Sequence, residues 1–529
     1  MNQLIDNSID VLIVGAGPAG LMTACQLAIH QIPFRIIDKN SSSSTNSGAL
    51  IVQARTLEIF EQMGISGDAL SEGVVAGSIN IIYNGKKITS TSINDLGGTL
   101  SLFPFLLMLE QSKTEKLLLN FIGDRGYSVE REVQIQGFTQ EDERVTSVVI
   151  LPDGSEQVIY SKYIIAADGS TSTIRNILNI PFEGKSYPKS IFIVDCKAES
   201  DLSPDEISFA FSKSSVAGFF PIKGSRWRID SNLPPEYENQ QKLTFDVVEQ
   251  NFQRWTQMNI HFQSQQWFSV TRSHQKYAKS VRFQNCFLIG DAAHVHTPVG
   301  AQGMNTGLQD ANNLAWKIAF VIKHRAKPSL LDSYSSERLG ISKGFARYAD
   351  VVFRVLTSGN SGVKFFRSYV LRLFFMVLFP LISRLKIFRR RFFKSISQIN
   401  INYRGSILSY RESRFNFFHA APKPGDRLPF FNLPEGGKNI SIYEKLDPAS
   451  FNLLVMADFL PDEVKQTGEQ FNLRVLLIPN IPETVSVYKQ LGIKKTGYYL
   501  IRPDMYVALK SANLNTLHLK RFLKQVFIK

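Results

Sequence analysis

The sequence predicts a multi-domain α/β protein: a Rossmann-like unit near the N-terminus, an inserted antiparallel sheet, and a small C-terminal α/β domain. Three observations carry this prediction: a glycine-rich turn between two apolar strands, strand-like runs between 190 and 229, and alternating strands and helices after 450. The chain has 529 residues, of which 44% are hydrophobic and 20% are charged. That composition excludes a wholly disordered or fibrous protein.

The first predicted element is a buried parallel strand over 10–14, followed directly by the turn Gly15-Ala-Gly-Pro-Ala-Gly20. A helix is expected over 21–29 and a second strand from Phe34, ending in Asp38. In such a unit the glycines allow a tight turn and a close approach of the backbone to a pyrophosphate, which the helix N-terminus attracts. A carboxylate at Asp38 can accept hydrogen bonds from a ribose diol. The pattern predicts dinucleotide binding without separating FAD from NAD.

Two later strands carry further motifs. Residues 163–167 form a strand-like run before Asp168-Gly-Ser-Thr-Ser-Thr-Ile-Arg175, and 286–289 form another before Gly290-Asp291. After the second motif comes a loop over 296–305 and a helix beginning near Thr306. Asp291 can bind a hydroxyl of a ribityl-like chain, and the glycines of the loop present N–H groups to an electron-rich ring edge. A flavin needs such donors because its reduction places negative charge there.

Together the GxGxxG, DG and GD motifs resemble those of the single-component FAD-dependent aromatic hydroxylases, the para-hydroxybenzoate hydroxylase-like class A flavoprotein monooxygenases. The most specific part of the resemblance runs from Gly290 to Lys317, and the whole covers roughly 8–405. The resemblance implies a Rossmann-like FAD-binding domain of the GR2 type. It also implies a monooxygenase that uses FAD, NADPH or NADH, and O₂ to hydroxylate an aromatic substrate, phenolic or polyketide-like, through a flavin C4a-hydroperoxide.

The resemblance also assigns residues to FAD. Arg55 would lie near the phosphates or the adenosine, Gln111 would line the flavin region, and Asp291 would bind the ribityl or pyrophosphate part. No catalytic side chain is assigned, and Pro298 and Gly300 would lie near the isoalloxazine. The full set expected to hold FAD is Gly15, Gly17, Pro18, Ala19, Gly20, Asp38, Lys39, Arg55, Gln111, Asp168, Gly290, Asp291, Pro298, Gly300, Gly303, Met304 and Asn305.

One position departs from the family. An arginine followed by alanine usually precedes the Ala-Arg-Thr-Leu-Glu segment around Arg55, whereas this chain has Gly48-Ala49. The missing cation bears on how the flavin moves or how the nicotinamide is contacted.

The strand-like runs between Phe182 and Arg272 predict an antiparallel sheet between the DG and GD motifs. In the resembled family such a sheet covers the flavin and forms an apolar, aromatic substrate pocket. Candidate wall residues are Phe211, Phe219, Phe220 and Trp227, and ordinary core packing is the alternative for each.

The segment 361–405 holds ten basic residues, eight phenylalanines and no acidic residue, in a chain of net charge +14. A solvated basic helix face and weak contact with an anionic membrane surface both fit this pattern. Nucleic acid is not expected as a partner because no nucleic-acid-binding module accompanies the segment. No apolar run reaches the roughly 18–20 residues of a membrane span, and no basic secretory n-region opens the chain, so a cytoplasmic protein is expected.

The C-terminal part resembles the thioredoxin-like domain of the phenol hydroxylase, pentachlorophenol monooxygenase and aromatic polyketide hydroxylase branch, most clearly over 499–507. No cysteine lies beyond Cys286, so dithiol chemistry is excluded and a scaffolding or dimer-contact role is expected. The predicted domains are 1–180 with 270–345 for FAD, 181–269 with parts of 76–100 for substrate, 346–405 as a basic helical segment, and 406–529 at the C-terminus.

Other functions stay open. A quinone or isoprenoid hydroxylase at a membrane surface would use the same fold, and a non-catalytic flavin-binding partner would use the same site. A halogenase is disfavoured because the chain has no WxWxIP stretch. His294 and His296 lie two apart with no evident third ligand, so no metal site is predicted. The chain is expected to be a monomer or a homodimer.

Overall fold

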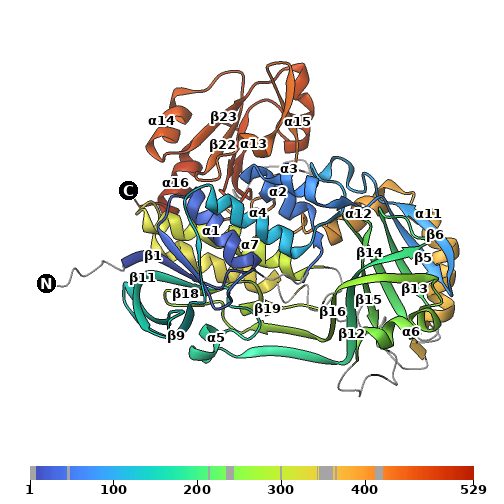
Figure 1. Cartoon of the computed structure of the whole chain (residues 1–529). Helices are drawn as coiled ribbons and strands as arrows, with labels where there is room; N and C mark the ends of the chain where they lie inside the picture. Colours follow the sequence, from blue (N-terminus) through green and yellow to red (C-terminus); the bar gives the residue numbers. More distant parts are fainter. Residues whose placement is uncertain are drawn as a thin grey trace.

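Two eight-stranded sheets and one four-stranded sheet organise the chain (Figure 1). The structure, a computed structural model, describes residues 8–43, 48–212, 215–233, 237, 243–297, 301–341, 344, 362–363, 366–410 and 421–528. Within them, no helix is long and apolar enough to cross a membrane.

The first sheet is built mainly from parallel strands in the order β17-β18-β11-β1-β2-β8, with β10 and β9 attached beside β11. Each strand of the predicted βαβ unit, and each strand before the DG and GD motifs, is present at its expected place. The strands are β1 (Ser8–Val14), β2 (Phe34–Asp38), β8 (Val129–Arg131), β9 (Gln134–Glu141), β10 (Arg144–Ile150), β11 (Glu156–Ala166), β17 (Arg282–Phe283) and β18 (Cys286–Leu288).

Strands β18, β11 and β1 are neighbours and run parallel. Parallel neighbours end at the same edge of a sheet, and ligands of open α/β sheets bind beyond such carboxyl ends. The three motif turns, 15–20 after β1, 168–172 after β11 and 290–292 after β18, are therefore brought to one edge although they are far apart in sequence.

Helices α1 (Pro18–Ile29), α4 (Gln111–Gly123) and α7 (Gly303–Ile322) pack together beside this sheet. Beyond them lie α2 (Ala54–Met63), α3 (Ser66–Glu72) and a small sheet of β3 (Ile51–Val52), β4 (Val74–Val75) and β7 (Leu107–Met108). The short helix α5 (Thr173–Ile177) follows the DG turn. Helix α7 is buried along almost its whole length, so it contacts structure on every side.

The second sheet has the order β19-β16-β12-β15-β14-β13-β5-β6, and its neighbours are antiparallel except for β13 and β5. It contains the predicted inserted strands and, from earlier in the chain, a hairpin. Its strands are β5 (Ser78–Tyr83), β6 (Lys86–Ser92), β12 (Phe182–Ser200), β13 (Glu206–Phe211), β14 (Val216–Ile222), β15 (Arg226–Asn232), β16 (Ile260–Ala278) and β19 (His294–Val295). Helix α6 (Phe245–Thr256) packs on one of its faces and closes a separate core there.

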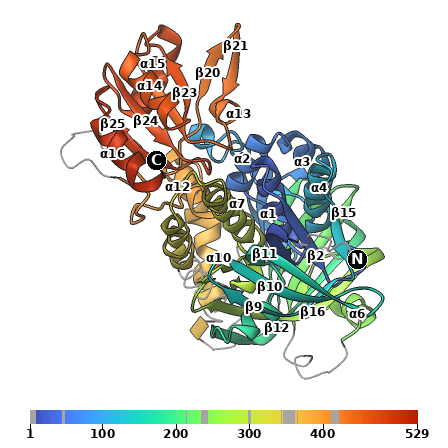
Figure 2. The same cartoon turned by 90° about the vertical axis from the view of Figure 1, so that its left-hand side faces the viewer.

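The C-terminal unit is a sheet in the order β23-β22-β24-β25, in which β22 and β23 are parallel and the other pairs antiparallel. The predicted small α/β domain is present, and its thioredoxin-like character stays a prediction. Its elements are β20 (Asn432–Glu435), β21 (Lys438–Ser441), α13 (Ile442–Lys445), β22 (Asn452–Met456), α14 (Asp462–Gln470), β23 (Arg474–Ile478), α15 (Val485–Leu491), β24 (Gly497–Ile501), β25 (Val507–Ser511) and α16 (Leu517–Val526). Figure 2 shows it seated above α2 and α7.

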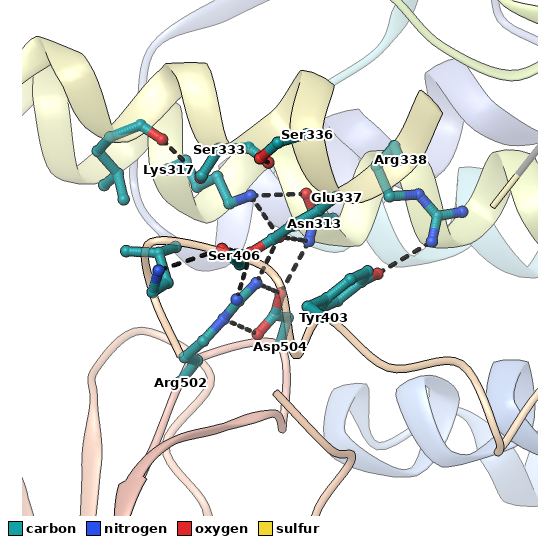
Figure 3. Close-up of polar contacts among 12 residues, drawn as sticks. Asn313, Lys317, Ser333, Ser336, Glu337, Arg338, Tyr403, Ser406, Arg502 and Asp504 are labelled. Atoms are coloured by element: carbon teal, nitrogen blue, oxygen red, sulfur yellow. Dashed lines mark hydrogen bonds and ion pairs between the residues drawn. The ribbon is translucent and has the colours of Figure 1, made fainter. Parts of the chain in front are cut away.

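A buried ionic cluster joins the C-terminal unit to α7 (Figure 3). Arg502 donates to both oxygens of Glu337, at 2.6 and 2.9 Å, and pairs with Asp504. Lys317 on α7 donates to the same Glu337 at 2.7 Å. Burial alone would raise the pKa of Glu337, but Arg502 and Lys317 outweigh it and hold that pKa well below its usual range. The charges are therefore paired in a water-free contact between the two parts of the chain.

Removing one member of this cluster should be costly. An Arg502→Met variant keeps an unbranched side chain but removes the guanidinium that Glu337 and Asp504 share. We expect a loss of about 3–5 kcal/mol in unfolding free energy, as for other broken buried ion pairs. Urea unfolding followed by circular dichroism measures it. As a control, Lys87→Ala removes the cation of a half-exposed pair with Glu206 and should cost under about 1 kcal/mol. Equal losses in the two variants would contradict the role of the cluster.

Candidate functional site

The turn after β1 is shaped by glycines that no other residue could replace. Gly15 has φ +101°, and a Cβ on it would lie 2.3 Å from the carbonyl oxygen of Ala167. A Cβ on Gly20 would lie 1.9 Å from the carbonyl oxygen of Gly15. These two glycines are therefore required by the close packing of the turn and α1 against the end of β11, and not by a ligand.

Gly17 and Gly303 have the opposite surroundings. A Cβ on either residue would meet no atom within 4 Å. Gly17 is the N-cap of α1, with Pro18 at its first position, and Gly303 begins α7. Open space thus lies at the starts of two helices, where unpaired N–H groups and the positive end of the helix dipole favour anionic groups.

The Asp38 side chain, at the end of β2, is hydrogen-bonded to the glycine-rich turn after β1. Its Oδ2 accepts a hydrogen bond from the Ala16 N–H at 2.7 Å, and its Oδ1 accepts one from Asn40 at 2.8 Å. Arg131 lies 3.9 Å from the same carboxylate. The predicted ribose-binding acid is therefore adjacent to the glycine-rich turn, and Lys39 beside it is exposed.

The DG turn contains a carboxylate with an unused oxygen. Oδ2 of Asp168 accepts from the Ile174 N–H at 3.2 Å, whereas the buried Oδ1 has no hydrogen-bond partner among the described residues. Burial raises the pKa of Asp168. An unpartnered buried oxygen is costly unless a ligand completes it. Arg175 donates to Ser170 O at 2.8 Å and Ala292 O at 3.0 Å, and so ties this turn to the GD turn.

The GD turn lies against α1 and α7. A Cβ on Gly290, whose φ is +54°, would come within 2.9 Å of the Ala19 Cβ. Solvent reaches Asp291, yet the surrounding protein is close enough to raise its pKa by desolvation. Such a carboxylate faces a space between elements, where it can accept hydrogen bonds from a polyol.

The start of α7 is fixed by Asn305. Its side-chain oxygen accepts from the Gln53 N–H at 2.9 Å and the Thr56 hydroxyl at 2.7 Å, and its amide donates to Ile51 O at 2.8 Å. The Asn305 side chain therefore positions the helix start, and Met304 packs partly against the main core. Pro298 and Gly300 lie outside the described residues.

These surroundings fit FAD. The open space at Gly17 and at Gly303, the unpartnered Asp168 oxygen and the solvent-accessible Asp291 are grouped at one sheet edge, and each offers what a part of the cofactor needs. The helix starts would hold the pyrophosphate and the pyrimidine edge of the ring, and Asp291 would hold the ribityl chain.

His294 is engaged inside the protein. Its Nε2 lies 2.6 Å from Oδ2 of Asp310, the carboxylate that also accepts from the Gly290 N–H at 3.1 Å. Its neighbour His296 is hydrogen-bonded to Gln275. Among the described residues no group of three potential ligands could hold a metal ion.

The structure places Arg55 against the C-terminal unit, and its expected contact with FAD stays a prediction. Arg55 is 1% exposed, pairs with Glu58 at 3.2 Å and donates to the carbonyl oxygen of Asp504 at 2.7 Å. It points into the C-terminal unit because that unit covers the helix face on which Arg55 lies. Sequence reasoning missed this because the partner is about 450 residues away.

Gly48 explains where Gln111 lies. A Cβ on Gly48 would fall 2.3 Å from Oε1 of Gln111, which instead accepts from the Ala49 N–H at 2.9 Å. The Gly48 carbonyl accepts from Nη1 of Arg228 at 2.7 Å. A cation from the second sheet thus lies beside the position where the family usually has an arginine.

The two faces of the second sheet separate the four predicted pocket residues. Successive side chains of a strand point to opposite faces. Phe219 and Trp227 lie in the separate core beneath α6, which is the core-packing alternative for these two residues. Phe211 and Phe220 lie on the opposite face, where Phe220 packs against the main core. The strand signal was correct, but which face meets α6 was decided by the tertiary structure.

The sequence analysis missed a polar group on that opposite face. Arg228 of β15 pairs with Asp195 of β12 through two hydrogen bonds of 2.8 Å. Asp230, two residues along β15, shares their face, and its buried Oδ1 has no partner among the described residues. Burial raises its pKa to about 6 despite the opposing charge of Arg228. The sequence signal for this polar face is the placement of charged residues, Arg226, Arg228 and Asp230, at every second position of β15.

Aromatic rings lie beside Asp230. Gly218 is its direct neighbour across the β14–β15 pair, and a Cβ on Gly218 would lie 2.8 Å from the ring of Phe220 and 3.5 Å from that of Phe209. These two rings meet edge to face with centroids 5.8 Å apart. The face therefore combines a carboxylate with an aromatic wall.

Comparisons with known proteins agree with this geometry. Residues 8–349 match the family model described as FAD binding domain. The chain is 28% identical to 6-methylpretetramide 4-monooxygenase of Streptomyces rimosus, covering 96% of this chain and 93% of that protein. It is 27% identical to pentachlorophenol 4-monooxygenase of Sphingobium chlorophenolicum, over 79% and 75% of the two. Its fold matches CabE, an aromatic hydroxylase from angucycline biosynthesis, with TM-score 0.75, 25% identity and coverage of 98% and 99%.

A side chain at position 17 should exclude the pyrophosphate. A Cβ at position 17 meets no protein atom within 4 Å, so we expect Gly17→Val to keep the fold and to lose FAD because its branched side chain fills the open space at the start of α1. We expect purified protein with less than a tenth of the wild-type flavin absorbance. Gly67→Val, at another glycine with open surroundings, is the matched control and should retain FAD. Full flavin content in Gly17→Val would show that the cofactor does not lie there.

Proposed function

Since the chain belongs to the FAD binding domain family, we propose that this FAD-dependent monooxygenase consumes NADH or NADPH and O₂ to hydroxylate an aromatic substrate of phenolic or polyketide-like type. One observation carries the proposal: three motif turns end adjacent parallel strands and leave open space at Gly17 and Gly303 beside the unpartnered oxygen of Asp168. Relatives named as monooxygenases of 6-methylpretetramide and of pentachlorophenol support the aromatic class.

When bound, FAD would supply the redox chemistry that joins NAD(P)H and O₂. The chain itself would bind the cofactor, orient the substrate and exclude water. The helix starts at Gly17 and Gly303 would hold its electron-rich groups, and Asp291 would accept hydrogen bonds from its ribityl chain. The second sheet presents Phe209 and Phe220 as an apolar wall, which restricts water and so favours transfer of oxygen to the substrate.

Asp230 is the group that we assign to the substrate hydroxyl. A phenol becomes more electron-rich when its proton is taken, and the unpartnered Oδ1 of Asp230 can accept that proton. Arg228 is paired with Asp195 through two hydrogen bonds, and among the described residues Oδ1 of Asp230 has no hydrogen-bond partner. The raised pKa of Asp230 makes it a better base than an exposed aspartate while leaving it ionised at neutral pH.

The cellular location, the oligomeric state and the role of the C-terminal unit are proposed from the sequence. The enzyme works in the cytoplasm as a monomer or a homodimer, and its C-terminal unit serves as scaffold for α7 or as a dimer contact. The buried cluster of Arg502 and Glu337 supports the scaffold role.

The activity is tested directly with FAD-loaded protein. We expect phenols, quinols or polycyclic phenols from a panel to stimulate NADH or NADPH consumption, and mass spectrometry to find a product with one additional oxygen atom. The ratio of product to cofactor consumed measures coupling. If no compound of the panel gave an oxygenated product and FAD were nevertheless bound, the binding-partner alternative would replace the enzyme.

Replacing Asp230 should separate base catalysis from cofactor binding. In wild type, kcat for a phenolic substrate should rise as the pH rises through about 6, since Asp230 accepts a proton only when ionised. Asp230→Asn should lower kcat by about 10²–10⁴-fold and abolish that rise, with unchanged FAD content. Asp201→Asn, at an exposed aspartate after β12, is the control. A persistent rise near pH 6 in Asp230→Asn would assign the proton transfer to another group.

A further inference from the structure

An exposed apolar stripe runs along the helical segment 366–387. The segment begins with a continuous helical run, which consists of Phe366–Val370, α10 (Leu371–Leu373), Phe374–Leu378 and α11 (Phe379–Ile382). It ends in the first residues of the next helix, α12 (Lys386–Ile396). Large apolar side chains that would ordinarily be buried are exposed here, up to 71% for Ile387. They are Phe366, Tyr369, Val370, Leu373, Met376, Val377, Leu378, Leu381, Leu385 and Ile387.

The segment is nevertheless firmly packed on its other side. Figure 1 shows α11 and α12 beside β5 and β6 at the end of the second sheet. The ring of Phe375 lies 6.2 Å from that of Phe211, and the Arg372 guanidinium lies 4.8 Å over the Tyr83 ring. Arg389 donates to Ser92 O at 2.9 Å and Asn94 O at 2.8 Å. These contacts on the inner side of the segment leave its apolar stripe facing outward.

Cations without carboxylate partners accompany the stripe. No acidic residue occurs between 361 and 405. Among the described residues, no ion pair includes any of the exposed cations between 384 and 394. They are Arg384, Lys386, Arg390, Arg391 and Lys394. Their charge is thus available to an outside partner.

We propose that this stripe and its cations dock the protein on the surface of a bilayer rich in anionic lipid. Apolar side chains enter the boundary between head groups and acyl chains while neighbouring cations meet lipid phosphates. The segment lies on the surface rather than crossing it, since no described helix could span. Nucleic acid fits less well because a polyanion gives the exposed leucines and valines no apolar surroundings. The inference does not depend on the hydroxylase activity.

Vesicle flotation with the full-length, FAD-loaded protein tests the docking. Vesicles of equal parts phosphatidylcholine and phosphatidylglycerol should carry at least tenfold more protein than phosphatidylcholine alone at low salt. Binding should fall when the salt is raised to about 1 M, where charges are screened over about 3 Å. Absence of binding to the anionic vesicles, or equal binding to both kinds, overturns the proposal.

Two variants separate the apolar and cationic contributions. Leu373→Ser with Val377→Ser should lose most vesicle binding, and Arg390→Gln with Arg391→Gln should lower it about tenfold. Both pairs are exposed, so FAD content should be unchanged. Matched controls in the C-terminal unit are Phe459→Ser, exposed at 73%, and Lys465→Gln with Lys495→Gln. A similar loss in the controls would overturn the assignment to this segment.

Competing occupants give their own outcomes. If the stripe instead meets a second copy, sedimentation without vesicles shows a dimer that the Leu373→Ser, Val377→Ser variant dissociates, and the membrane proposal is overturned. If single-stranded RNA displaces the protein from vesicles and binds it with equal salt sensitivity, a polyanion site replaces it. A monomer that binds anionic vesicles and ignores RNA supports the proposal.

Discussion

The carboxylate of Asp310 ties the molecule together. It accepts from the Gly290 N–H, from His294 and, at 2.7 Å, from Arg338, in surroundings without solvent. Burial alone would raise the pKa of Asp310, but Arg338 and His294 outweigh it and hold it at about 2. About one and two turns further along α7, Asn313 and Lys317 reach Glu337, and earlier in the helix Asn305 reaches α2. A single helix therefore fixes the GD turn, its own first turn at Asn305 and the position of the C-terminal unit.

This arrangement explains why the C-terminal unit matters to a site that it does not contain. Arg55 donates to Asp504 O, and Arg427 pairs with Glu58 at 2.6 Å. Both contacts fix α2, whose N-terminal residues Gln53 and Thr56 hold Asn305. The contacts run continuously from the C-terminal unit to the start of α7, so the unit stabilises the position of that helix start by packing and ion pairing.

Successive side chains of the second sheet point to opposite faces, so one face forms a core and the other carries the polar residues proposed for the reaction. One face, with Phe219 and Trp227, closes a core with α6. The other face presents Arg228, Asp195 and Asp230 beside Phe209 and Phe220, and Arg228 reaches across to Gly48. A shift of one residue in the register of β15 would exchange the two faces. The buried ion pair of Arg228 and Asp195 penalises that shift, because it would turn Arg228 into the α6 core and leave Asp195 on β12 without its cation.

The sequence by itself determined the family, the βαβ unit and the three motif turns, because those turns depend on local requirements: glycine at positive φ, a strand before it and a helix after it. It also indicated the basic, aromatic segment 361–405. Only the tertiary structure decided that Arg55 faces the C-terminal unit, that Phe219 and Trp227 belong to the α6 core, and that Asp230 lies beside an aromatic wall. These outcomes depend on which faces meet between elements distant in sequence, and a single sequence carries the periodicity of each face but not the partner that covers it.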